Sequence, residues 1–266
     1  MKISNVIYAC FSPTGTTRKI VEAIAEGTGA ESVKHIDLTL PETVKDIQID
    51  HEDTLIIFGA PVYGGRLPAE AARRLSKIRG SNTPAVAVVV YGNREFEDAL
   101  IELRDLVLKS GFTPVAGAAF IGEHSFTTPD MPLAEGRPDS NDLEIAEKFG
   151  SDVIGKLSST EKIKEISELS VPGNFPYKET RPPNKDSAGT DMDKCIQCNE
   201  CVELCPTGAI TPDDNLTTDP DLCIMCCACV KGCPEEARII ESEHVSKARK
   251  WLYDNYSTPK KPETFF

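Results

Sequence analysis

One stretch near the start of the chain, residues 3–27, decides the fold; it reads ISNVIYACFSPTGTTRKIVEAIAEG. Its first part, Ile3–Cys10, is a short apolar run of strand length. A loop rich in hydroxyl side chains, Ser12–Arg18, follows and leads into the amphipathic stretch Thr16–Gly27. A strand that passes through a tight loop into a helix is the repeating unit of a parallel α/β sheet.

The same unit recurs down to about residue 169. Further strands are expected at Ser32–Leu38, Leu55–Ala60, Ala85–Tyr91 and Val115–Ile121. Further helices are expected at Ala69–Ile78, Phe96–Ser110 and Asp142–Ser158. Short apolar strands separated by helices predict an α/β domain with a doubly wound, five-stranded parallel sheet. Ligands of such sheets bind beyond the carboxyl ends of the strands.

The cysteines indicate a second domain. Nine of the ten lie in a dense block, where two runs share the spacing C-x2-C-x2-C-x3-C-P with an offset of 28 residues. This spacing lets three thiolates hold one [4Fe–4S] cubane while the fourth reaches across to the other. One cluster is therefore assigned Cys195, Cys198, Cys201 and Cys233, and the other Cys223, Cys226, Cys229 and Cys205.

Zinc is the alternative metal that such cysteines could bind. Zinc ribbons use C-x2-C pairs, but a tight triplet followed by a cysteine before proline, occurring twice, is poorly explained by tetrahedral zinc. The block resembles the bacterial two-cluster ferredoxin over about Asp191–Ile240, which implies a small α+β ferredoxin-like domain. Cys227 has no place in the ligand pattern and is expected to pack as a small apolar residue.

Composition changes set the expected boundaries. The α/β domain spans residues 1–169, and a Pro-rich linker over 170–190 contains Pro172, Pro176, Pro182 and Pro183. The cluster domain spans residues 191–241. A final helix, His244–Tyr256, and a polar tail make up residues 242–266.

The loop after the first strand is suited to a phosphate. It offers hydroxyl groups and a glycine at a helix N-terminus, where free N–H groups and the helix dipole favour an anion. There is no Walker lysine and no G-x-G-x-x-G, which disfavours a nucleotide triphosphate or a dinucleotide. The pattern S-x-T-G-x-T resembles the phosphate loop of flavodoxins, which hold FMN; an ordinary helix cap is the alternative. The candidate residues are Ser12, Thr14, Gly15, Thr16 and Thr17.

Two further loops follow strands at the same predicted edge, where flavodoxins grip the isoalloxazine ring. Tyr63 or Tyr91 is a candidate to stack on that ring, and the glycines would let the backbone come close to it. Ordinary turns between strand and helix are the alternative. The candidate residues are Pro61, Val62, Tyr63, Gly64, Gly65, Tyr91, Gly92, Asn93 and Arg94.

Taken whole, the chain resembles the fused flavodoxin–ferredoxin proteins of anaerobic prokaryotes, called the EFR1 family. The likeness also covers Phe120–Phe126, which contains His124, a candidate proton donor or substrate contact; a histidine that bonds locally is the alternative. The resemblance implies FMN and two [4Fe–4S] clusters in one polypeptide. It leaves the physiological reaction unassigned.

Charge and hydropathy exclude several classes of function. The net charge of −13 disfavours nucleic acid and anionic membranes and permits a basic redox partner protein. Apolar runs such as Ala85–Tyr91 are far shorter than the roughly 18–20 residues of a membrane span, and a cytoplasmic location is expected. Sequence leaves the oligomeric state open.

The expected function is electron transfer between FMN and the clusters, linking external partners. One alternative is a flavin-dependent reductase of a small acceptor, with Phe120–Pro132 as a substrate-facing lid. The other is a redox sensor.

Overall fold

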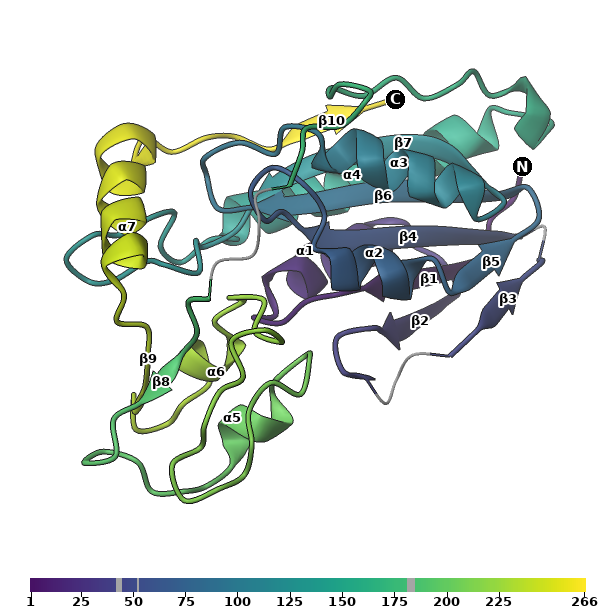
Figure 1. Ribbon diagram of the computed structural model, residues 1–266. Helices are drawn as coiled ribbons and strands as arrows, with labels where there is room; N and C mark the ends of the chain where they lie inside the picture. The colour runs from purple at the N-terminus through teal and green to yellow at the C-terminus, as the bar shows by residue number, and fades with distance from the viewer. Residues whose placement is uncertain (42–44, 52, 181–184) are drawn as a thin grey trace.

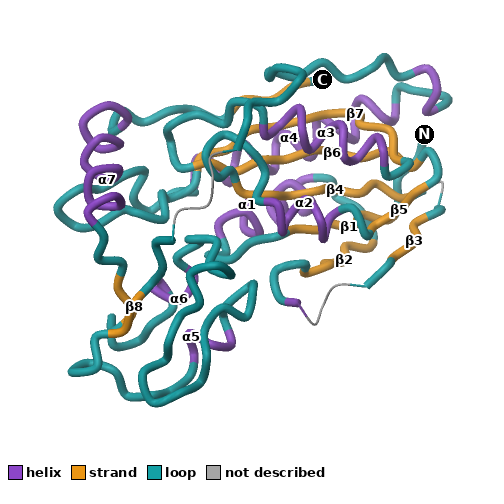
Figure 2. The backbone as a smooth tube through the Cα atoms, in the orientation of Figure 1, coloured by secondary structure: helices purple, strands orange, loops and turns teal. Residues whose placement is uncertain are grey.

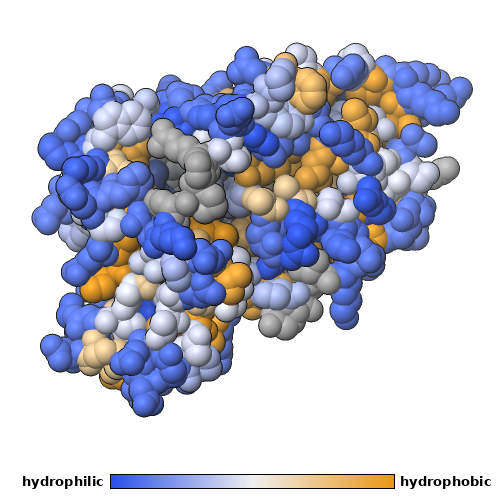
Figure 3. All heavy atoms as spheres, in the orientation of Figure 1, coloured by the Kyte–Doolittle hydropathy of each residue, from blue (hydrophilic) through white to orange (hydrophobic). Residues whose placement is uncertain are grey.

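The computed structural model of the chain describes residues 1–41, 45–51, 53–180 and 185–266. Pro182 and Pro183, two prolines of the expected linker, lie outside these residues. Figure 1 shows a layered domain with a central sheet, and the cysteine-rich part beside one end of that sheet. Most of the visible face is hydrophilic, with apolar residues in scattered patches (Figure 3).

The central sheet has the strand order β10-β7-β6-β4-β1-β2. Its strands are β1 (Asn5–Cys10), β2 (Ser32–Asp37), β4 (Thr54–Pro61), β6 (Thr83–Tyr91), β7 (Phe112–Ile121) and β10 (Glu263–Phe265). The strands from β2 to β7 run parallel, which confirms the five expected strands. Taken in chain order they are arranged 2-1-3-4-5, the flavodoxin-like order.

Helices cover both faces of the sheet (Figures 1 and 2). They are α1 (Thr16–Gly27), α2 (Ala69–Leu75), α3 (Ala99–Lys109) and α4 (Ser140–Ser158). Each face has its own apolar core: α1 and α4 pack on one side, and α2 and α3 on the other. Because both faces are buried, every residue of β6 is buried, and its sequence is a nearly continuous apolar run.

The helix expected over Ala69–Ile78 is shorter than predicted. Ser76 ends α2, and Ile78–Gly80 forms the strand β5, which pairs in parallel with β3 (Ile47–Ile49). Gly80 allows this course because a Cβ added there would lie 2.4 Å from the ring of Phe112. The apolar side chain of Ile78 therefore enters the core from a strand rather than from a third helical turn.

The last residues of the chain return to the sheet. Helix α7 (Glu243–Tyr256) begins at Ser242, whose hydroxyl accepts a hydrogen bond from the Val245 N–H at 3.0 Å. After α7 the chain adds β10 antiparallel to β7, with Glu263 opposite Ala119. The expected polar tail thus forms a sixth strand, which covers the outer edge of β7 (Figure 1).

The cysteine-rich part repeats its backbone as well as its sequence. It contains the short helices α5 (Glu200–Glu203) and α6 (Ala228–Lys231) and the paired strands β8 (Gly189–Thr190) and β9 (Arg238–Ile239). Equivalent positions of the two runs share left-handed φ values, 54° at Gln197 and 55° at Met225. Asn199 and Cys227 are likewise matched, at 64° and 62°.

The chain between the two parts is held against the first domain. Leu169 and Val171 are buried in the core on the α3 side. The Asn174 N–H donates to Asp98 at 2.8 Å. The hydroxyl of Tyr177 donates to Asp105 at 2.6 Å. A 3-10 turn, Ile163–Glu165, precedes this segment. None of the described helices is both long and apolar enough to cross a membrane.

Candidate cofactor-binding sites

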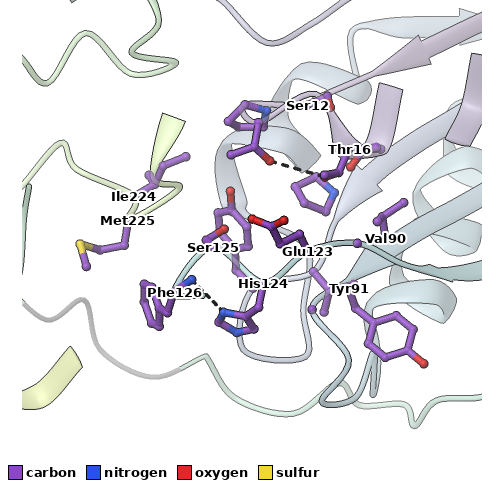
Figure 4. A pocket seen from close by; sticks show the side chains of 18 of the residues that line it. Ser12, Thr16, Val90, Tyr91, Glu123, His124, Ser125, Phe126, Ile224 and Met225 are labelled. Atoms are coloured by element: carbon purple, nitrogen blue, oxygen red, sulfur yellow. Dashed lines mark hydrogen bonds between the residues drawn. The ribbon is translucent and has the colours of Figure 1, made fainter. Parts of the chain in front are cut away.

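An open cavity of about 210 Å³ lies at the carboxyl ends of β1, β4, β6 and β7 (Figure 4). We call it the strand-end cavity. Four chain segments of the first domain and one of the cysteine-rich part form its wall. Its lining residues are Ser12, Pro13, Thr14, Thr16, Thr17, Pro61, Val62, Tyr63, Gly64, Val90, Tyr91, Gly92, Gly122, Glu123, His124, Ser125, Phe126, Ile224 and Met225.

The loop between β1 and α1 is folded around its own hydrogen bonds. Gly15 has φ 79°, a left-handed conformation that favours glycine, and its N–H donates to the Ser12 carbonyl at 3.1 Å. The Ser12 hydroxyl accepts from the Arg18 N–H at 3.0 Å. Helix α1 has no side-chain cap and no acidic residue in its first turn. Its N-terminus and the hydroxyls of Thr14 and Thr16 therefore present donors to an anion.

The loop after β4 forms the second wall. Tyr63 and Arg66 bond through their backbones, with the Tyr63 N–H donating to the Arg66 carbonyl at 2.9 Å. Burial raises the pKa of Tyr63 well above its usual value, and nearby Cys226 and Cys227 add to this. Tyr63 therefore lies between the strand-end cavity and the cysteine-rich part, and its phenol stays protonated.

The loop after β6 contributes backbone atoms to the cavity wall, but not the Tyr91 ring that was a candidate to stack on a flavin. The ring of Tyr91 packs on Phe96, with centroids 5.5 Å apart, and Figure 4 shows it directed away from the cavity. Asn93 is buried and bonds the chain after α7. Arg94 pairs with Glu97, whose side chain also fills the space beside Gly65. Four of the predicted residues thus lie outside the cavity lining: Gly15, Gly65, Asn93 and Arg94.

His124 lines the cavity in a fixed orientation. Its Nδ1 accepts a hydrogen bond from the Phe126 N–H at 3.0 Å (Figure 4), which leaves the proton of the neutral ring on Nε2. Burial, with the nearby charges of Lys231 and Arg94, lowers the pKa of His124 to about 4. A Cβ added to Gly92 would lie 2.4 Å from Cδ2 of this ring, so glycine makes room for it. The histidine is a neutral hydrogen-bond donor at pH 7.

Glu123 connects this loop to the cysteine-rich part. Its carboxylate forms an ion pair with Lys231 of α6 and accepts from the Gly136 N–H at 2.9 Å. Burial opposes ionisation, but these hydrogen bonds outweigh it and lower the pKa of Glu123. The sequence placed Gly122, Glu123, Ser125 and Phe126 near the site as part of Phe120–Phe126 and of the expected lid Phe120–Pro132. The wall residues that it missed are Pro13, Val90, Ile224 and Met225.

Two further cavities lie within the cysteine-rich part. We call them the Cys195 cavity and the Cys223 cavity, each after the first cysteine of its run. The cysteines that line the Cys195 cavity are Cys195, Cys198, Cys201 and Cys233. Those that line the Cys223 cavity are Cys205, Cys223, Cys226, Cys229 and Cys227. The structure therefore brings each expected set of four to one cavity, and the chain crosses over between the two runs.

Backbone N–H groups donate to sulfurs of both runs. The Ala209 N–H donates to Cys205 Sγ and the Ala237 N–H to Cys233 Sγ, each at 3.2 Å. Hydrogen bonds of this kind to cysteine sulfurs tune iron–sulfur clusters. Over the described residues, no three His, Cys, Asp or Glu side chains converge closely enough to hold a single metal ion.

Cys227 and Cys10 are not part of either set of four. Cys227 is 3% exposed, and its thiol lies 3.7 Å from the Met225 carbonyl. Burial raises its pKa, so it remains a neutral thiol. Cys10 is fully buried in the core on the α1 side.

Ile224 and Met225 line two cavities at once. They stand between Cys223 and Cys226 in the sequence, line the Cys223 cavity, and also line the strand-end cavity. Figure 4 shows them entering from the cysteine-rich part opposite the loops of the first domain. Two side chains therefore separate the two spaces.

Comparison with known proteins finds one family model that matches the cysteine-rich part. A family model described as a 4Fe-4S binding domain matches residues 189–211. The chain combines a flavodoxin-like fold with a segment that matches this model. No curated protein matches the chain.

Solved structures are similar to the first domain. One is a flavodoxin from the domain Archaea, 17% identical over 58% of this chain and 99% of that chain, with a TM-score of 0.36. Another is a flavodoxin of Streptococcus pneumonia TIGR4, 17% identical over 57% of this chain and 99% of that chain, with a TM-score of 0.40. The Flv1 flavodiiron core from Synechocystis sp. PCC6803 is 20% identical over 60% of this chain and 37% of that chain, with a TM-score of 0.43.

Proposed function

We propose that the chain binds FMN in the strand-end cavity and a [4Fe–4S] cluster in each cysteine cavity, and relays electrons between them. The observation that carries this proposal is the shared wall of Ile224 and Met225. When bound, FMN would exchange two electrons in single steps, while each cluster would exchange one. The fused flavodoxin–ferredoxin family is the group whose cofactor content this proposal matches.

The first domain supplies groups suited to FMN. The N-terminus of α1 and the hydroxyls of Ser12, Thr14 and Thr16 would hold the phosphate. The backbone at Gly64 and Gly92 would allow the ring to approach closely. The ion pair between Lys231 and Glu123 neutralises the carboxylate that lines this cavity, which reduces its repulsion of a phosphate or a reduced ring.

The arrangement favours one order of transfer. The Cys223 cavity adjoins the strand-end cavity, so its cluster would exchange electrons with FMN. The Cys195 cavity shares no lining residue with the strand-end cavity, and the exposed Ile196 and Cys198 line it. An external redox protein would therefore dock at the Cys195 run. Ten acidic and three basic residues over 191–238 favour a basic surface on that partner.

A buried contact fixes the two parts together. Arg74 of α2 is 1% exposed and donates to the carbonyls of Leu38, at 3.0 Å, and Pro206. Pro206 directly follows Cys205, a ligand of the cluster nearest FMN. This connection supports a rigid placement of the Cys223 cavity against the first domain. We accordingly propose residues 1–169 and 191–241 as the two cofactor-binding units, in the reducing conditions of the cytoplasm, where thiolates persist.

The proposal is tested by quantifying iron, sulfide and flavin on anaerobically purified full-length protein. We expect about eight irons, about eight sulfides and one FMN per chain. Zinc without sulfide, or clusters without flavin, would contradict it.

Matched cysteine variants test the ligand sets. Cys201→Ser should remove about half of the iron and sulfide while FMN stays bound. Cys227→Ser is the control, since Cys227 is a buried cysteine that lines the Cys223 cavity without being a ligand, and it should retain all of the iron. Equal iron loss in both variants would show that the ligand assignment is wrong.

A further inference from the structure

Arg238 is a buried cation in the cysteine-rich part. It lies on β9, five residues after Cys233, and is 2% exposed. Its two terminal nitrogens donate to four neutral oxygens. Nη1 donates to Leu216 O and Thr190 Oγ1, and Nη2 to Ala188 O and Thr218 Oγ1. The positive charge therefore stays uncompensated by these partners, although burying an unpaired charge is costly.

The guanidinium lies between the two cysteine cavities. Arg238 and its acceptor Leu216 line the Cys195 cavity, whereas the acceptors Ala188 and Thr218 line the Cys223 cavity. The guanidinium is also near enough to Cys229 of the Cys223 cavity to interact with its thiol. One cation thus lies beside both cavities.

One donor of Arg238 has no acceptor. Within the described ranges, its Nε–H is buried and makes no hydrogen bond. An unsatisfied buried donor costs about 1–3 kcal/mol, and native structures rarely leave one without a reason. Thiolate and sulfide sulfurs of an anionic cluster are acceptors that would satisfy both the Nε–H and the charge.

We propose that Arg238 holds and tunes both clusters: its Nε–H donates to a sulfur of the Cys195-cavity cluster, and its charge raises the reduction potentials of both. Reduction adds negative charge to a cluster, and a fixed cation a short distance away in a water-poor interior stabilises that charge more than it would at the surface. This inference rests on the proposed function, because it requires clusters in both cavities. Arg238 acts as a positioning residue, through the sulfurs that it contacts.

The test is an EPR-monitored reductive titration of the full-length protein, comparing wild type with Arg238→Gln and Arg238→Lys. Arg238→Gln should make reduction of at least one cluster tenfold less favourable, a lowering of about 59 mV for a one-electron couple. Arg238→Lys keeps the charge but loses the planar fork, so its shift should be smaller. If Arg238→Gln binds iron incompletely, the comparison of wild type with Arg238→Lys tests the proposal instead.

Lys194→Gln provides the matched control. Lys194 adjoins Cys195, but its side chain is 55% exposed and pairs with Asp191 at 3.8 Å. Solvent screens such a charge, so its removal should leave both potentials unchanged. A purely structural role for Arg238 would lower thermal stability while fully loaded clusters kept wild-type potentials, and that result would overturn the inference. Absence of clusters in the wild type would instead overturn the proposed function.

Discussion

The burial of His124 makes the stability of the protein depend on pH. Burial lowers its pKa from 6.5 to about 4, so the unfolded chain binds a proton near pH 6 that the folded chain refuses. The contribution of this residue is fully present above pH 6.5 and is lost as the pH falls toward 4. Between pH 8 and pH 6 the wild type should lose about 1 kcal/mol through this one residue. Urea unfolding followed by circular dichroism at both pH values measures the loss.

The variant His124→Asn isolates this effect. Asparagine keeps an acceptor for the Phe126 N–H but does not titrate, so the variant should lose less stability between pH 8 and pH 6. His244→Asn, at an exposed position near the start of α7, controls for removal of a histidine. The same pH dependence in wild type and His124→Asn would show that His124 is not buried as described.

Single residues differ in how well the sequence predicted them. The grouping of the cysteines into two cavities was predictable, because their spacing indicates which thiols meet. The ring of Tyr91 was not, since an aromatic residue at a strand end can turn toward the ligand or toward the core, and here Phe96 holds it. Arg238 gave no signal, because its hydrogen-bond partners lie in two segments that are distant in the sequence, 188–190 and 216–218.

The segment after α7 is anchored by one asparagine. The side-chain amide of Asn93 donates to the carbonyls of Tyr256 and Thr258, at 2.6 and 2.9 Å, and its oxygen accepts from the Lys260 N–H at 3.0 Å. Asn93→Gly should release this segment and β10, because about 1 kcal/mol is lost with each of several hydrogen bonds. Glycine suits the left-handed φ of 63° at this position, so the backbone itself is not strained.

Limited trypsin digestion measures that release. Cleavage after Lys260 should become at least tenfold faster in Asn93→Gly, since local opening exposes the bond. Asn82→Gly is the control because Asn82 has a similar φ of 56° but is exposed. Equal cleavage rates in the two variants would show that Asn93 does not anchor the segment.

Elements with a strong apolar period were predicted best. The helix Thr16–Gly27 was predicted with both of its ends, because an amphipathic run is bounded there by a phosphate-type loop and a glycine. Strand β10 was not predicted. Three residues within a polar tail are too few to show a hydrophobic periodicity. They form a strand because the outer edge of β7 is available for pairing.

The two domains form one electron-transfer unit only if the wall between their cavities is thin and stable. Two contacts stabilise it from either side: the ion pair of Lys231 with Glu123, and the donation of Arg74 to the Pro206 carbonyl. Ile224 and Met225 fill the space between these contacts. Sequence predicted both domains, but it had no means of showing which run of cysteines meets the first domain, because the two runs are nearly equivalent.

Met225→Gly tests this wall directly. Met225 has a left-handed φ of 55°, so glycine removes the side chain without straining the backbone. Burying a methionine side chain contributes about 1.5–3 kcal/mol, and roughly half of that would be lost from the FMN-bound state. We expect FMN to dissociate about tenfold faster, which is followed by the recovery of flavin fluorescence after dilution.

The internal repeat supplies the control for Met225→Gly. Gln197 occupies the equivalent position of the first run, with a φ of 54°, but is exposed and lines neither the strand-end cavity nor the Cys223 cavity. Gln197→Gly makes the same backbone change next to a cluster and should leave FMN release unchanged. If both variants release FMN equally fast, loosening of the cysteine-rich part as a whole is responsible. If only Met225→Gly does, the second run of cysteines meets the flavin, and the relay order follows from that contact.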